Sequence, residues 1–218
     1  MACVLVGPRI GRFGTKTTKK FAYRGHSNTL TGVGAFLLMM GILGYNMSAQ
    51  LNLSNPDDGF VVSLSAINTL LAGSAGAIVA TITGRATPTG GYRWSYNTML
   101  NGAIAGMVSS CAGCNALPFW GAYATGAGAG FLFFVLRALV NHLHGNEFWE
   151  TFAKSLILSI YCITITVDDP LDAFAVHFGG GFFGTVSTPL LVRTGVLIVG
   201  DTNSAQVRIY TINSFKSE

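Results

Sequence analysis

The chain has 218 residues, of which 50% are hydrophobic and only 10% are charged, and its net charge is +4 at pH 7. Soluble globular proteins carry roughly a quarter charged residues, so this composition excludes an ordinary water-soluble domain. The 28 glycines suit membrane helices, where small residues let helix backbones approach one another. The composition therefore predicts an all-α, polytopic helical membrane protein.

The predicted elements are drawn around four stretches without Asp, Glu, Lys or Arg, at residues 25–56, 59–84, 94–136 and 173–192. About 20 apolar residues are enough for a helix to cross the roughly 30 Å hydrocarbon core of a bilayer. Five spans are predicted on this basis, at about residues 28–49, 60–83, 96–114, 119–140 and 170–199. Residues 1–6 are also apolar, but they are too few for the hydrophobic region of a signal peptide and suggest the end of a preceding helix.

Basic residues gather in two of the connections. Those before the first span are Arg9, Arg12, Lys16, Lys19, Lys20 and Arg24. Residues 84–95 also carry two arginines, whereas residues 50–59 carry two aspartates and no basic residue. Because cytoplasmic loops are enriched in Lys and Arg, residues 7–25 and 84–95 are predicted to be cytoplasmic and residues 50–59 external.

Two of the spans have faces made of small residues. In residues 67–84 and 101–114, Gly, Ala and Ser recur three and four positions apart, which places them on one side of a helix. Small residues let membrane helices pack closely. Both faces are therefore predicted to contact other helices.

Three short motifs give weaker signals. Asn52 begins a sequon in the predicted external connection, which makes it a glycosylation candidate. Cys111 and Cys114 form a C-x-x-C pair with no second pair and no histidine at ligand spacing, so no metal site is predicted and the thiols are assigned to packing. Residues 124–131 are rich in glycine but lack the strand and the acidic residue of a dinucleotide site, so no cofactor is predicted.

Residues 141–167 do not fit the pattern of spans. Their uncharged part, residues 155–167, has thirteen residues and is shorter than a crossing. We expect an interfacial or loosely packed helix on the cytoplasmic side, with His142 and His144 in solvent. The alternative is a tilted crossing in which Lys154 reaches the interface.

The last predicted span contains one histidine, His177, and no charged residue follows it for fifteen positions. A charged side chain at the centre of a membrane helix costs about 2.5 to 3.5 kcal/mol, so the neutral imidazole is favoured there. A neutral ring both donates and accepts a hydrogen bond, as a proton relay requires. The alternative is a packing histidine bonded to a neighbouring helix. Ionisable residues within membranes mark transport paths, which favours the relay.

Polar and small residues surround this histidine. Asp172 lies five residues earlier, so it points to a different side of the helix and is not expected to pair with the ring. With Asp168 and Asp169, it is predicted to stabilise the positive end of the helix and to cap free amides. Gly179 and Gly180 leave the helix thin and let another helix or a narrow lumen come close.

The segment VDDPLDAFAVHFGGGFFGT, residues 167–185, closely resembles the penultimate-helix signature of the ammonium transporter (Amt/Mep/Rh) family, in its animal-like Amt branch. Supporting matches occur in family order in residues 6–13, 25–46, 56–74 and 101–115. The resemblance therefore implies a partial ammonium transporter domain in residues 1–206, with an insertion at 141–167 and a divergent polar tail at 207–218.

The resemblance implies trimers of eleven-helix subunits in the plasma membrane, each with its own narrow pore. The five spans would form the second of two inverted repeats. In the family, two histidines line the lumen and stacked phenylalanines gate it, and the ion loses its proton before ammonia passes. His177 matches the second histidine, Tyr45 replaces a gate phenylalanine, and Asn46 is assigned to the same pore.

The family's first lumen histidine would lie before Met1, and its last helix would follow the matched part, so the chain is expected to be truncated at both ends. It would then transport ammonium, ammonia or possibly methylammonium only together with the missing half. The alternative is a non-transporting subunit that joins and impairs full-length trimers. We predict no enzymatic activity and no nucleic acid partner; the expected partners are membrane lipid and either identical copies or full-length relatives.

Overall fold

The structure is a computed structural model that describes residues 9, 25–51, 53–87, 93–143, 169 and 171–192. Its elements are α2 (Asn28–Ser48), α3 (Asp58–Ala86), α4 (Tyr96–Ser110), α5 (Phe119–Leu143), η2 (Phe174–Gly179) and α7 (Gly180–Leu191). All of these are helical, and η2 is a π-helical turn that continues into α7. The predicted all-α class is thus confirmed. Asn52, Asp168, nearly all of 144–170 and residues 193–218 lie outside the described residues.

Three of the described helices are long and apolar enough to cross a membrane, over residues 28–48, 58–86 and 119–139. The predicted span 96–114 is corrected at its end, because α4 stops at Ser110. Residues 111–116 form turns instead, with Cys111 N bonded to Val108 O at 3.1 Å and Gly113 N to Ser110 O at 3.0 Å. Such tighter i to i−3 bonds satisfy carbonyls at a helix end.

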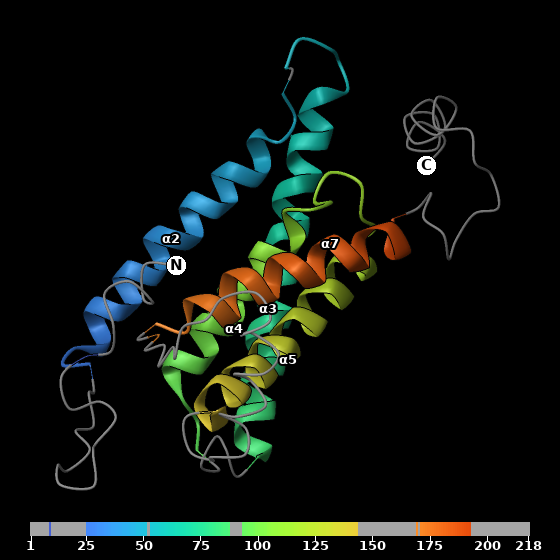
Figure 1. Cartoon of the computed structure of the whole chain (residues 1–218). Coiled ribbons are helices and arrows are strands. Elements are labelled where there is room, and N and C mark those ends of the chain that lie inside the picture. Colours follow the sequence, from blue (N-terminus) through green and yellow to red (C-terminus); the bar gives the residue numbers. More distant parts are fainter. Residues whose placement is uncertain are drawn as a thin grey trace, which may run out of the picture.

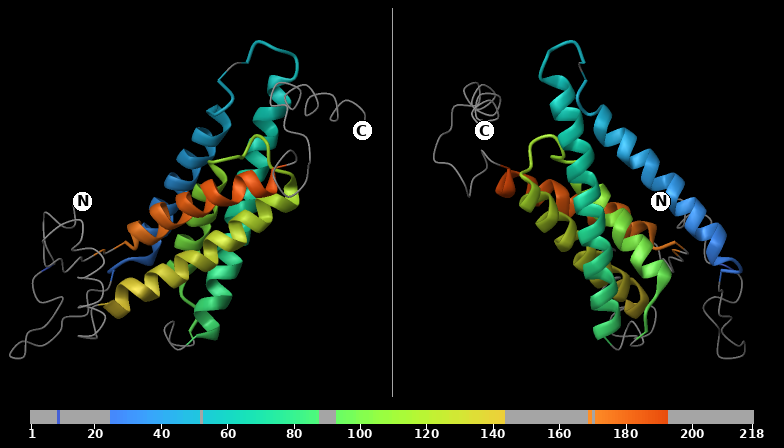
Figure 2. Two further views of the ribbon diagram at one scale, coloured as in Figure 1. Left: turned by 45° about the vertical axis from the view of Figure 1, so that its right-hand side comes forward. Right: turned by 180° about the vertical axis from the view of Figure 1, so that it is seen from behind.

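Successive helices run in alternating directions (Figure 1). The connection between α2 and α3 and the connection between α4 and α5 lie toward one end of the bundle, which we call the outer end. The start of α4, the end of α5 and the start of η2 lie toward the opposite, inner end. Helices α3, α4 and α5 pack together, η2 and α7 pack on α4 and α5, and α2 packs on α3 and α4. Figure 2 shows α2 diverging from α3 toward the inner end.

Hydroxyl and carboxylate groups cap the helix starts. Ser27 accepts a hydrogen bond from Leu30 N at 3.2 Å, and Ser95 accepts one from Thr98 N at 3.3 Å. Both are typical N-cap contacts. Asp58, in the first turn of α3, accepts bonds from Asn55 N at 2.9 Å and from Gln50 Nε2 at 2.8 Å. The two serine caps explain why α2 and α4 begin at these residues, and the bonds of Asp58 hold the chain that leads into α3.

Small residues form the contacts among the three central helices. A Cβ added at Gly102 would lie 2.7 Å from Gly76 O, and one added at Gly106 or Gly126 would collide with the backbone of Ala72. The predicted small-residue faces of residues 67–84 and 101–114 are therefore confirmed as packing faces. Their partners are each other, α5 and α7, within this chain.

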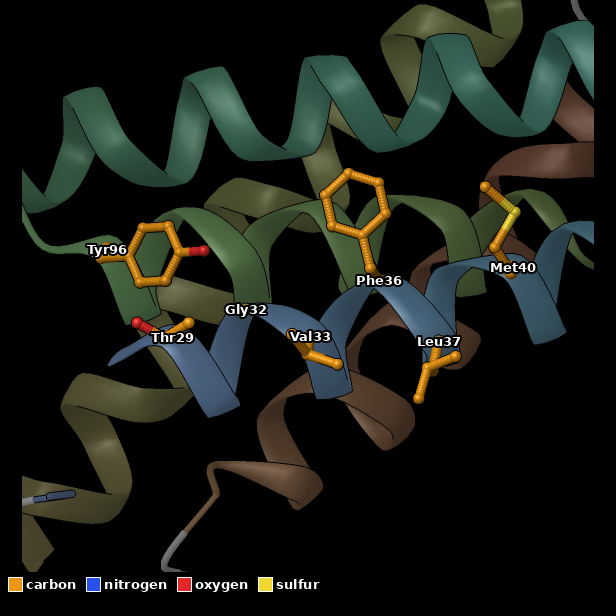
Figure 3. Close-up of a pocket in the computed structure, with 7 residues that line it drawn as sticks. All are labelled: Thr29, Gly32, Val33, Phe36, Leu37, Met40 and Tyr96. Atoms are coloured by element: carbon orange, nitrogen blue, oxygen red, sulfur yellow. The ribbon is translucent and has the colours of Figure 1, made fainter. Parts of the chain in front are cut away.

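Large apolar side chains cover much of the exterior, especially on α2. An open groove of about 460 Å³ lies between α2 and Tyr96. Figure 3 shows its lining, which consists of Thr29, Gly32, Val33, Phe36, Leu37, Met40 and Tyr96. Exposed apolar surface of this extent is unfavourable in water and acceptable in lipid or against another protein.

Candidate transport path

His177 lies in the π-helical turn η2 and points away from its own bundle. The exposed face of this helix consists of His177 with Phe174, Phe178 and Phe182, and we call these four residues the histidine face. The opposite side of the helix, which includes Ala175 and Val176, is buried against the other helices. Among the described residues, the imidazole makes no hydrogen bond. The alternative of a packing histidine therefore has no partner helix in the described part of the chain.

The three phenylalanines of the histidine face form a row. The rings of Phe174 and Phe178 are stacked with centroids 4.8 Å apart, and those of Phe178 and Phe182 are 6.1 Å apart. Their spacing of four residues places them in line on one helix face. The sequence analysis did not identify this row, although that spacing was a usable signal.

Glycines set the depth of this helix in the bundle. A Cβ at Gly179 would lie 2.6 Å from Leu136 Cδ1 of α5, and one at Gly180 would lie 2.7 Å from Ala105 O of α4. A Cβ at Gly184 would collide with Ser109 O. Because larger side chains would push the helix outward, these glycines keep the histidine face at its present distance from α4 and α5.

The carboxylates at the start of η2 have different roles. Asp169 Oδ2 accepts a hydrogen bond from Phe174 N at 2.8 Å, which is a capping contact. The carboxylate of Asp172 instead forms an ion pair with Arg137 of α5, with Oδ2 3.0 Å from Nε. The backbone of Asp172 has a positive φ of 56°. The sequence analysis missed Arg137, because the pairing spans a predicted insertion and has no local pattern.

Arg137 also bonds to α4. Its Nη1 donates to Thr98 Oγ1 at 2.7 Å. Asn101 Nδ2 lies 3.4 Å from Asp172 Oδ2 and 3.3 Å from Leu171 O. The inner ends of α4 and α5 are thus tied to the start of the helix that carries His177.

Tyr45 and Asn46, the other predicted pore residues, point in different directions. Tyr45 is exposed, whereas Asn46 is fully buried. Asn46 Nδ2 donates to Thr69 Oγ1 at 3.0 Å, to Ser110 Oγ at 3.3 Å and to Met107 O at 3.4 Å. The structure therefore places Asn46 in a link between α2, α3 and α4. It does not bring Asn46 onto the histidine face.

A second buried asparagine ties down the connection between α4 and α5. Asn68 Nδ2 donates to Cys114 O and to Leu117 O, both at 2.8 Å. Cys114 Sγ donates to Asn46 O at 3.5 Å. In this connection, burial raises the pKa of the Cys111 and Cys114 thiols, so both stay protonated at neutral pH. Among the described residues no group of three or more His, Cys, Asp or Glu side chains could hold a metal ion.

Known proteins similar to this chain were found by sequence and by structure. The sequence model described as Ammonium Transporter Family matches residues 1–214. The chain is 34% identical to putative ammonium transporter 1 of Caenorhabditis elegans, with 90% of this chain and 32% of that protein covered. It is 31% identical to ammonium transporter 1 member 2 of Oryza sativa subsp. japonica, with 87% and 35% covered. The chain thus spans about a third of the length of these relatives.

Two solved structures are similar in fold. The structure titled Sensor Amt Protein aligns with a TM-score of 0.64 and 25% identity, covering 88% of this chain and 40% of that one. Mep2 of Saccharomyces cerevisiae aligns with a TM-score of 0.61 and 22% identity, covering 91% and 38%. The second likeness concerns the fold alone.

Proposed function

The chain belongs to the ammonium transporter family, and from this premise we propose that it lines part of a transmembrane path for ammonium or ammonia. The observation that supports this role is the histidine face of η2 and α7. It presents an imidazole and a row of three rings on the side that faces away from α4 and α5. Because the chain spans about a third of its relatives' length, we propose that further protein completes the path.

An imidazole that faces lipid has an unfavourable solvation free energy. For this reason we expect that something covers the histidine face in the membrane. A neutral ring has one N–H donor and one acceptor nitrogen, and hydrocarbon can partner neither. A polar group without a partner in an apolar medium costs several kcal/mol. A facing helix or a line of water and substrate would remove that cost. His177 would then orient the substrate or pass protons, as the resemblance implies.

Tyr45 and Asn46 fit this proposal in separate roles. Tyr45 is exposed at the outer end of α2 and is our candidate for a gate residue, where its hydroxyl would make the gate more polar. Asn46 anchors that end of α2 through Thr69 and Ser110. We therefore assign Asn46 a supporting role in holding Tyr45 in place.

Methylammonium uptake tests the role of His177. The chain is expressed in cells that lack their own ammonium transporters, alone and with a full-length relative, and is compared with His177→Ala. His26→Ala is the matched control, because His26 is an exposed histidine before α2. Uptake that is lost in His177→Ala and kept in His26→Ala supports the proposal. Equal uptake by all three forms contradicts a role for His177.

The alternative function is a non-transporting subunit that joins trimers of a full-length relative and impairs them. Since the small-residue faces already pack within the chain, such a subunit would have to use another surface. The exposed apolar face of α2, with Val33, Phe36 and Leu37, is one candidate among the described residues. Copurification together with reduced uptake by the relative would support this alternative.

A further inference from the structure

The helix that carries His177 begins with two unusual backbone conformations. Asp172 has a φ of 56°, in the left-handed region that few residues other than glycine adopt. The π-helical turn Phe174–Gly179 follows directly. Such turns are rare and often occur at functional sites. A left-handed residue other than glycine is costly and persists only where surrounding contacts restrain it.

Two neighbouring residues of α5 supply such contacts. Leu136 lies against Gly179, at the end of the π-helical turn. Arg137 forms the ion pair with Asp172, before the start of the turn. The turn is therefore held at both sides by one short segment of α5. His177 lies between the two contacts and, among the described residues, has no hydrogen bond of its own to fix its direction.

The geometry of the Arg137 guanidinium suits it to hold the start of the π-helical turn. Arginine presents its donors in a rigid planar fork. Here, Nε lies 3.0 Å from Asp172 Oδ2, while Nη1 donates to Thr98 Oγ1 at 2.7 Å. One side chain thus links α4, α5 and the left-handed residue. A lysine would keep the charge but could not direct two donors in this fixed arrangement.

We propose that Arg137 is the positioning residue for His177: through Asp172 it holds the left-handed residue and the π-helical turn, which direct the imidazole away from the bundle. Without this restraint the turn closes into a regular α-helix or unwinds. Glycine contacts hold α7 against α4. If the π-helical turn becomes a regular α-helix, the residues of η2 must therefore rotate relative to α7. This inference rests on the proposed function, since the direction of His177 matters there only if it faces the transport path.

Histidine reactivity measures this effect without requiring transport. The full chain in membrane vesicles is treated with diethyl pyrocarbonate, and mass spectrometry gives the modification rate of His177 relative to His26. The variants are Arg137→Gln and Arg137→Lys. Arg85→Gln is the matched control, since Arg85 stacks on Trp94, 5.8 Å from the ring centre. Protection of the buried Cys114 from N-ethylmaleimide reports that the bundle remains folded.

We expect Arg137→Gln to change the relative rate of His177 at least threefold, with Cys114 still protected. A lower rate indicates closing of the turn, and a higher rate indicates unwinding. Arg137→Lys should restore part of the original rate, and Arg85→Gln should have no effect. A His177 rate that changes less than threefold in Arg137→Gln, with Cys114 still protected, overturns the proposal.

If Arg137→Gln exposes Cys114, the same measurement is made on Asp172→Asn, which removes the charge of the ion pair and keeps a residue type that tolerates the left-handed conformation. A His177 rate changed at least threefold with Cys114 protected supports the proposal, and any other outcome contradicts it. A shifted His177 rate together with unchanged methylammonium uptake would keep the positioning role and contradict the transport role. The two proposals can therefore fail separately.

Discussion

At the scale of single residues, hydrogen bonds fix which way the buried amide of Asn46 points. Thr69 Oγ1 donates to Ser65 O at 2.7 Å, and Ser110 Oγ donates to Met107 O at 2.8 Å. Since each hydroxyl has one proton, both oxygens can only accept from Asn46. The amide nitrogen must therefore face them. The Oδ1 atom has no partner among the described residues.

This arrangement predicts that Asn46→Asp is more damaging than Asn46→Ala. The alanine variant loses the donor contacts and should lower the stability of the folded chain by about 1 to 3 kcal/mol. The aspartate variant replaces a donor by an acceptor that faces three other oxygens, so its loss should be larger. The measurement is the fraction of chain still folded in detergent after heating. Asn97→Ala, at an exposed position of α4, is the control, and an aspartate variant as stable as the original would contradict the assigned network.

At the scale of elements, the sequence predicted the helices well and the contacts at the inner end poorly. Charge-free stretches located the described helices, three of which are long and apolar enough to cross a membrane, because charge exclusion from lipid is a local property of the sequence. The spacing of Gly, Ala and Ser likewise located the packing faces. The π-helical turn has only six residues, too few for its altered period to be read from the sequence. The pair of Arg137 and Asp172 depends on how α5 and η2 meet, which follows from the tertiary fold.

The packing of the central helices predicts opposite effects for two glycine substitutions. In Gly106→Ala, the added methyl group would collide with the backbone of Ala72, so the helices must move apart at a cost of about 1 to 3 kcal/mol. In Gly34→Ala, the methyl group meets nothing within 4 Å. Alanine is also the better helix former, so this variant should be as stable as the original or more stable. Thermal unfolding of both variants in detergent checks the contrast, and equal losses would contradict it.

At the scale of the whole molecule, the described charges are divided between the two ends. Asp57 and Asp58 lie at the outer end, whereas Arg85 and Arg137 lie at the inner end together with Asp169 and Asp172. The ion pair of Arg137 with Asp172 also brings the end of α5 and the start of η2 to the same end, on either side of residues 144–168. With the positive-inside bias, this arrangement predicts a cytoplasmic inner end.

Glycosylation mapping tests this orientation at both ends of the bundle. Asn52 should be glycosylated when the chain is expressed in a eukaryotic membrane, because its neighbours Leu51 and Leu53 are at the outer end and exposed. Ser54→Ala should abolish that modification, since the sequon requires the hydroxyl. A second sequon made by Leu143→Asn with Gly145→Ser, in the Ser54→Ala chain, should stay unmodified, because α5 is predicted to end on the cytoplasmic side. Modification at 143 without modification at 52 would mean that the bundle is inserted in the reverse sense. Tyr45 would then lie on the cytoplasmic side, and the end of the bundle that carries Arg137 would lie on the external side.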